Sequence, residues 1–188
     1  MTINLSKIAM RNADLAGAVL REANLSGSDL SGSDLSNADL AGADLREAVL
    51  INVLLRNAAL RNAKLAGADL TGAVLSNANL CSADLRGAVL TDAVLTGAKL
   101  AGATLRNSVL CNADLFNADL RGAVLRNADL RGAVLHNADL TNADLTGAIL
   151  IGADLFNADL TNAVLTGTDL ANADLTYAKI DSENENKQ

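Results

Sequence analysis

Leucine occupies every fifth position of this chain from Leu5 to Leu175, and only Met10 and Ile180 replace it in that register. We name the five positions of the repeat by their place relative to this leucine column. The small column lies two residues before it and holds mostly Ala. The pre-leucine column lies directly before it, the post-leucine column directly after it, and the turn column two residues after it.

A period of five is incompatible with a regular helix or a flat strand. Five residues of an α-helix turn through about 500°, so successive leucines would spiral around the axis. In a strand, every second leucine would point to the wrong face because side chains alternate with period two. The pattern instead predicts a backbone that bends once per five residues with the same side inward, and that stacks coil upon coil.

The turn column carries the residues that a repeated bend needs. All 14 glycines lie in it, and most of its other members are Asn. Both residue types tolerate positive φ, which a type II turn requires at its third residue. A merely polar surface would not explain why Gly is missing from the other four columns. We therefore expect a tight turn in every repeat.

The motif A-(D/N)-L-x-x resembles the repeat of the pentapeptide repeat protein family. It appears, for example, as Ala38-Asp39-Leu40, Ala113-Asp114-Leu115 and Ala143-Asp144-Leu145, and the resemblance covers about residues 4–180. It implies an all-β fold, a right-handed quadrilateral parallel β-helix (β-solenoid) with four pentapeptides per coil and about nine coils. It also implies that the leucine and small columns point inward and the other three outward.

We expect residues 1–180 to form one domain and residues 181–188 to be a polar, disordered tail. An apolar content of 50% argues against disorder of the whole chain. The absence of a long apolar run and of a signal-peptide pattern predicts a cytoplasmic protein without a membrane partner. The net charge of −7 disfavours direct binding to nucleic acid. Cys81 and Cys111 are separated by one and a half coils, so we expect two free thiols.

Two stretches depart from the pattern. At the N-terminus, Ile3 and Ile8 replace Ala and Met10 replaces Leu, and we expect these larger side chains to plug an otherwise uncovered first coil. In residues 51–60, Val53 enters the small column and Leu54 the pre-leucine column. We expect the coil to be locally swollen there.

Residues four repeats apart should stack, which defines the sides of the rod. The ring face is the side that carries Leu15, Leu35 and so on to Leu175. Its post-leucine column contains three consecutive rings: Phe116, His136 and Phe156. Its pre-leucine column contains three consecutive aliphatic side chains: Leu54, Val74 and Val94. Stacked rings one coil apart are within contact distance of each other.

The charges of the ring face differ from those of the side half a lap away. The ring face carries five aspartates against one arginine, a net −4: Asp14, Asp34, Asp114, Asp154 and Asp174 against Arg56. The arginine face, which carries Leu5, Leu25 and so on to Leu165, has six cations against four acids, a net +2. The apolar ridge on the acidic side fits a protein-docking surface. It also fits a structural explanation, in which stacked Val, Phe and Thr stabilise β-ladders.

No pattern for catalysis, a cofactor or a metal is found. His136 has no second His or nearby Cys and fits a stacked surface ring better than a ligand or base. The stacked carboxylates Asp119, Asp139 and Asp159 would suit a calcium ion chemically, but solvated surface charge explains them without one. We therefore predict a protein that is not an enzyme.

Two functional hypotheses follow. The first is a non-enzymatic structural rod that presents a flat face or an end to a protein partner of unknown identity. Tyr177 and Ile180 are candidate contacts at the C-terminal end, where a homodimer through an uncapped end is one arrangement. The second rests on the resemblance alone: some pentapeptide repeat proteins protect DNA gyrase by mimicking duplex DNA, and an acidic rod fits that role broadly.

Overall fold

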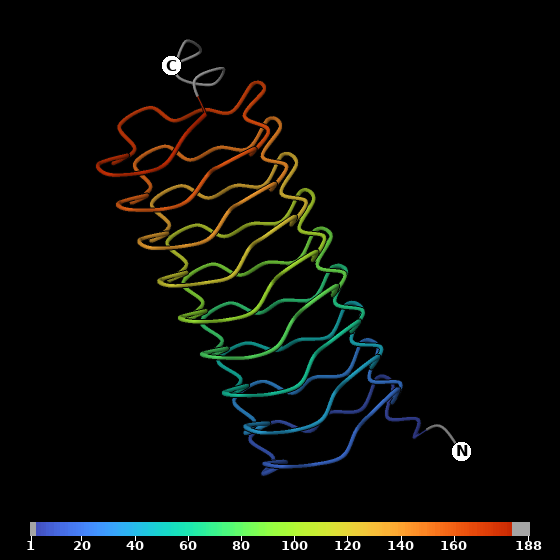
Figure 1. The fold of residues 1–188 in the computed structure, drawn as a ribbon. Coiled ribbons are helices and arrows are strands. Elements are labelled where there is room, and N and C mark those ends of the chain that lie inside the picture. Colours follow the sequence, from blue (N-terminus) through green and yellow to red (C-terminus); the bar gives the residue numbers. More distant parts are fainter. Residues whose placement is uncertain (1–2, 182–188) are drawn as a thin grey trace.

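The computed structural model describes residues 3–181, which form a rod of stacked coils with the two chain ends at opposite ends of the rod (Figure 1). Within these residues there is no helix and no strand longer than one residue. Parallel β-bridges join equivalent residues of successive coils, from Asn4 with Asn24 to Asp159 with Lys179. One lap of the coil therefore takes four repeats.

Backbone hydrogen bonds hold each coil to both of its neighbours. Leu115 N donates to Val134 O of the following coil at 2.7 Å, whereas Asp114 N donates to Ala93 O of the preceding coil at 2.9 Å. Asn117 N adds a second bond to the following coil, to His136 O at 3.0 Å. Because donors point both ways, an interior coil has no unpaired strand edge.

The predicted turns are confirmed. Every turn-column residue from Lys7 to Tyr177 has a positive φ between 55° and 69°, whether or not it is glycine. The turn is closed by a hydrogen bond such as Ala118 N to Leu115 O at 3.0 Å. A positive φ at the third residue of a turn so bonded is what a type II turn requires.

The leucine and small columns point inward, as predicted. Leucines from Leu25 to Leu160 are at most 1% exposed. The three serines of the small column, Ser28, Ser33 and Ser108, are buried too, and their hydroxyls donate to backbone carbonyls at 2.6–2.7 Å. The core is therefore a single column of aliphatic side chains in which every buried hydroxyl has an acceptor.

The expected swelling in residues 51–60 is not seen in the backbone ladder. Val53 is fully buried, yet Leu54 N bonds Ser33 O at 2.9 Å and Leu55 N bonds Val74 O at 2.7 Å, as in other coils. Val53 fits because its column neighbours on the adjacent coils, Ser33 and Ala73, are both small.

Within residues 3–181, each terminal coil has a neighbouring coil on one side only. Ile3 and Ile8 are 46% and 41% exposed, so the expectation that they plug the first coil is wrong for these two residues, whereas Met10 is partly buried against the core. In the last coil, Leu175 and Ile180 are only partly buried. Of the predicted tail, Asp181 is described, and its side chain accepts a hydrogen bond from Asn162 N; residues 182–188 lie outside the described part. No helix suited to crossing a membrane is found in residues 3–181.

Candidate interaction surface

The rings of the ring face form one continuous stack. Phe116 and His136 have ring centroids 5.4 Å apart, and His136 and Phe156 lie 4.7 Å apart in a stacked arrangement. Tyr177 lies in the turn column of the next coil and packs edge-on against Phe156, with centroids 5.3 Å apart. The predicted stacking is thus confirmed, and Tyr177 extends it to four rings, which we call the ring column.

The aliphatic residues of the same face also stack. Leu54 bridges Val74, and Val74 bridges Val94. Val94 in turn bridges Asp114, which lies two residues before Phe116. The aliphatic run therefore ends where the ring column begins. The aliphatic side chains and the first three rings are half-buried, whereas Tyr177 is 74% exposed. Ile180 lies elsewhere, packed against the core of the last coil.

Aspartates of the pre-leucine column have a structural role that sequence reasoning missed. Every Asp or Asn in this column accepts a hydrogen bond from the backbone N–H two residues later. Phe116 N and Phe156 N, for example, donate to Asp114 Oδ1 and Asp154 Oδ1 at 2.9 Å each. This N–H is the one backbone donor of the repeat that neither the ladder nor the turn uses. The acceptor oxygen that Asp and Asn share was the available signal.

Acidic groups border the ring column. Asp154 Oδ2 lies 3.7 Å from His136 Nδ1, and Asp114 Oδ2 accepts the hydroxyl of Thr96 at 2.9 Å. Hydrogen bonds from the hydroxyl and N–H of Thr176 lower the pKa of Asp174. Side-chain carboxylates therefore lie beside the rings along the whole ring column.

Most carboxylates on the other sides of the rod are paired with cations. On the arginine face, Arg86 donates twice to Asp84, and Arg126 bonds Asp144 of the next coil. Such exposed pairs contribute little stability, about 0–1 kcal/mol each, but they cancel charge. On the ring face, by contrast, no Asp within residues 3–181 forms an ion pair with Lys or Arg, and only Asp154 lies within ion-pair distance of a basic side chain, His136.

The stacked carboxylates Asp119, Asp139 and Asp159 have counter-ions of their own. Arg121 lies 2.7 Å from Asp119 and 3.6 Å from Asp139, and Lys179 lies 2.8 Å from Asp159. No group of three potential metal ligands occurs in residues 3–181. Arg121 and Lys179 therefore offset most of the charge of this stack, and each of the three carboxylates lies within 4 Å of one of them.

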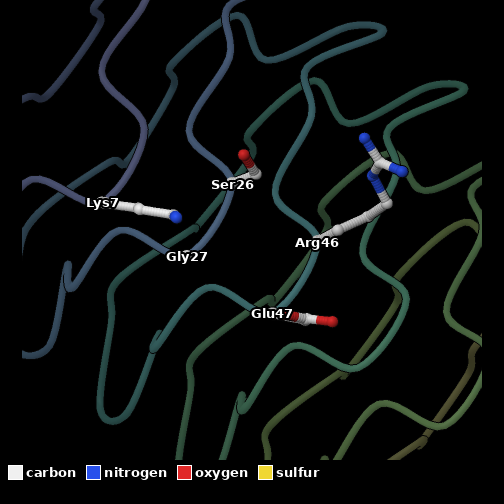
Figure 2. Close-up of a pocket in the computed structure, with 5 residues that line it drawn as sticks. All are labelled: Lys7, Ser26, Gly27, Arg46 and Glu47. Carbon is white, nitrogen blue, oxygen red and sulfur yellow. The ribbon is translucent and has the colours of Figure 1, made fainter.

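A hollow near the N-terminal end is open and lacks converging groups. Its volume is about 260 Å³, and it lies at Gly27, between the side chains of Lys7 and Glu47 (Figure 2). The Arg46 guanidinium points away from Lys7 and is held by two bonds to Asp44. The hollow is thus the space left by a missing side chain.

Both cysteines are free, as predicted.

Comparisons with known proteins agree with this β-solenoid. The profile of the family described as Pentapeptide repeats matches in 8 copies, over residues 3–37, 38–77, 73–112, 113–152 and 153–182. The chain therefore belongs to the pentapeptide repeat family, and the resemblance seen in its sequence is confirmed. No curated protein matches it.

Solved structures of several pentapeptide repeat proteins are similar to the chain. HetL from Nostoc sp. strain PCC 7120, which is involved in heterocyst differentiation regulation, is 40% identical over 94% of this chain and 86% of its own, with a TM-score of 0.33. Trypsin-treated QnrB1, a plasmid-mediated fluoroquinolone resistance protein, is 21% identical over 95% and 91% of the two chains, with a TM-score of 0.66. The latter likeness shows the fold alone.

Proposed function

We propose that this chain is a non-enzymatic interaction rod that docks another protein on its ring face. One observation carries the proposal. The sequence contains two Phe, one Tyr, one His and no Trp, and all four rings lie in the ring column. Every other post-leucine position is occupied by small, hydroxylated, aliphatic, thiol or charged residues.

The fold itself does not require rings at these positions. The same backbone positions carry Ser76 and Thr96 in the two coils before Phe116, with the same ladder bonds. Ring stacking contributes about 0.5–1.5 kcal/mol per pair, so it adds stability but does not explain why all four rings are gathered on one side. Aromatic side chains are enriched at protein interfaces because they bury a large area with few rotatable bonds.

The surroundings of the ring column indicate the chemistry of its partner. Asp114, Asp154 and Asp174 border the rings, and the aliphatic run Leu54–Val74–Val94 continues the apolar ridge. A partner with an apolar patch edged by Lys or Arg would be complementary in both respects. The charge of these aspartates would mainly affect the association rate and the choice of partner, whereas the rings would mainly determine the affinity.

Affinity capture with a matched pair of double variants tests this proposal. Phe116→Ser with Phe156→Ser removes two rings, whereas Ile149→Ser with Ile151→Ser removes two exposed apolar side chains from another side of the rod. We expect a partner captured by the parent protein to be lost with the first variant and kept with the second. Retention of the same partner by the ring variant would contradict the proposal. Unfolding midpoints of both variants confirm that they remain folded.

Protection of DNA gyrase is the second candidate, and the likeness to QnrB1 in fold is what favours it. The charge pattern supports it less well. Carboxylates of a DNA mimic should follow one another along the rod, but Leu54, Val74 and Val94 interrupt those of the ring face. A supercoiling assay with and without a fluoroquinolone separates the candidates: protection would establish the mimic, and no effect at high protein excess would exclude it.

The shape of the coil completes the proposal. Four repeats per lap support a four-sided cross-section, and the family implies a right-handed coil. Four flat sides would separate the ring face from the arginine face by half a lap. A crystal structure at a resolution that shows the carbonyl oxygens would test both features.

A further inference from the structure

The two ends of the rod present unpaired backbone groups. In the first coil, the N–H and C=O groups of Ala9, Asp14 and Val19 face away from the rest of the rod and have no partner within residues 3–181. In the last coil, the N–H groups of Leu170 and Leu175 likewise have no acceptor within that range. Such edges are the usual templates for pairing with another chain.

The unpaired groups of one end match those of the other. Inside the rod, a leucine N–H donates to a pre-leucine carbonyl of the following coil, as Leu115 does to Val134. If a second copy continued the coil in register from Ile8 onward, nine laps further on, Leu170 N would face Ala9 O of that copy. In the reverse direction, Ala9 N of the copy would face Thr168 O. Each junction bond would repeat one already present in every interior coil.

Side-chain size agrees with this arrangement. Ile3 and Ile8 are the large members of the small column and are 46% and 41% exposed in the first coil. In the continued coil Ile8 would lie over Thr168, a smaller and only partly buried member of the same column. The junction would therefore bury the aliphatic surface that the chain by itself leaves exposed to water.

Charge distinguishes head-to-tail from tail-to-tail association. The first coil, residues 3–22, carries three cations and two acids, a net +1: Lys7, Arg11 and Arg21 against Asp14 and Glu22. The last coil, residues 162–181, carries one cation and three acids, a net −2: Lys179 against Asp169, Asp174 and Asp181. Head-to-tail contact joins opposite charges, whereas tail-to-tail contact would bring two negative coils together.

We infer that the open ends of this rod bind each other, so that the C-terminal coil of one copy docks on the N-terminal coil of a second copy. The contact is heterologous, so it leaves a free end at each side and allows open-ended association. It is only one coil deep, so association is weak and depends on protein concentration. The inference is independent of docking on the ring face, because it uses neither the ring column nor the aliphatic run.

Sedimentation velocity on the full chain tests the association. We expect the weight-average sedimentation coefficient to rise with protein concentration, and to rise less at high salt because opposite charges meet at the junction. A coefficient that stays at the monomer value at every concentration would overturn the inference.

Two end-blocked variants establish the direction. Ala9→Pro with Val19→Pro removes two donors of the first coil that have no acceptor in residues 3–181, so no described bond within the chain is lost. Leu175→Lys places a charge on the apolar side of the last coil. Each variant alone should sediment as a monomer, whereas an equimolar mixture should form a one-to-one dimer through its two intact ends. The matched control, Ala9→Ser with Val19→Thr, keeps the N–H groups and should associate like the parent.

The outcomes of the mixing experiment are decisive. Formation of the dimer only in the mixture supports head-to-tail contact. Self-association of the proline variant through its intact C-terminal coil would show tail-to-tail contact and overturn the inference. Circular dichroism and unfolding midpoints of each variant establish that both are folded, so that loss of association is not loss of structure.

Discussion

The interior coils and the two terminal coils have the same repeat but different environments. Leu125 lies between coils on both sides and is fully buried, whereas Leu175 has a coil on one side and is only partly buried. The motif therefore determines the turn and the inward direction, and the neighbouring coils supply the burial. Stability of such a rod is close to a sum of contributions from each coil and its contacts with the next.

The largest expected difference between the two regions lies in the leucine column. Leu125→Ala should lower the free energy of unfolding by about 2–5 kcal/mol, because it leaves a cavity that packed neighbours cannot fill. Leu175→Ala should cost clearly less, because Leu175 is already partly exposed to solvent. Chemical denaturation of both variants measures the difference, and equal costs would contradict the comparison.

Backbone strain comes next. Gly122 has a φ of +62°, and a Cβ added there would meet nothing within 4 Å, so any cost reflects conformation and not collision. Gly122→Val should lower the free energy of unfolding by about 1–3 kcal/mol because a β-branched residue disfavours positive φ. Gly122→Asn should be tolerated, because Asn117 and Asn127 already adopt a positive φ at the neighbouring turns. If denaturation gives the two variants equal free energies of unfolding, the positive φ is not the reason why glycine occupies this position.

Loss of a pre-leucine carboxylate should have a smaller effect. Asp69 Oδ1 accepts hydrogen bonds from the N–H and hydroxyl of Thr71 at 3.0 and 2.6 Å. Asp69→Ala should cost about 0.5–1.5 kcal/mol, the net value of such a bond. Asp69→Asn keeps an acceptor oxygen and should lie close to the parent protein. A large decrease in the free energy of unfolding for Asp69→Asn, measured by the same denaturation, would mean that Asp69 stabilises the fold through its charge and not through its acceptor oxygen.

Acid should weaken the rod gradually. Hydrogen bonds from Lys179 and Thr161 lower the pKa of Asp159 from 3.8 to about 2. Because the folded state holds the proton less tightly, this carboxylate stabilises the fold above pH 3.8, and its contribution is lost as the pH falls towards 2. The denaturation midpoint should therefore fall in that range. Asp159→Asn, which does not titrate, should show a smaller decline, and an unchanged decline would exclude this residue as a cause.

The strict period predicted a bend every five residues, and the family resemblance supplied the lap of four repeats, from which the stacking of Phe116, His136 and Phe156 follows. Sequence reasoning placed Tyr177 in a turn column of the last coil but missed its contact with Phe156, because the two rings belong to different columns. It also treated aspartates such as Asp114 as surface charge, because their bond to the backbone depends on a side-chain direction that spacing does not reveal. The prediction of a swelling at Val53 was wrong because it did not take into account that the neighbours of Val53 in the adjacent coils, Ser33 and Ala73, are small.

The spacing of the bridges, four repeats to a lap, also limits how such a gene can change in length. Loss or duplication of one full lap shortens or lengthens the rod by one coil and keeps every outward side chain on the same side of the rod. Loss of a single repeat keeps the turns but moves every residue beyond the deletion to the next side of the rod. A deletion between Val94 and Phe116 would therefore place the rings and the aliphatic run on different sides. A change in length of twenty residues should therefore preserve the composition of each side of the rod, whereas a change of five residues should alter it.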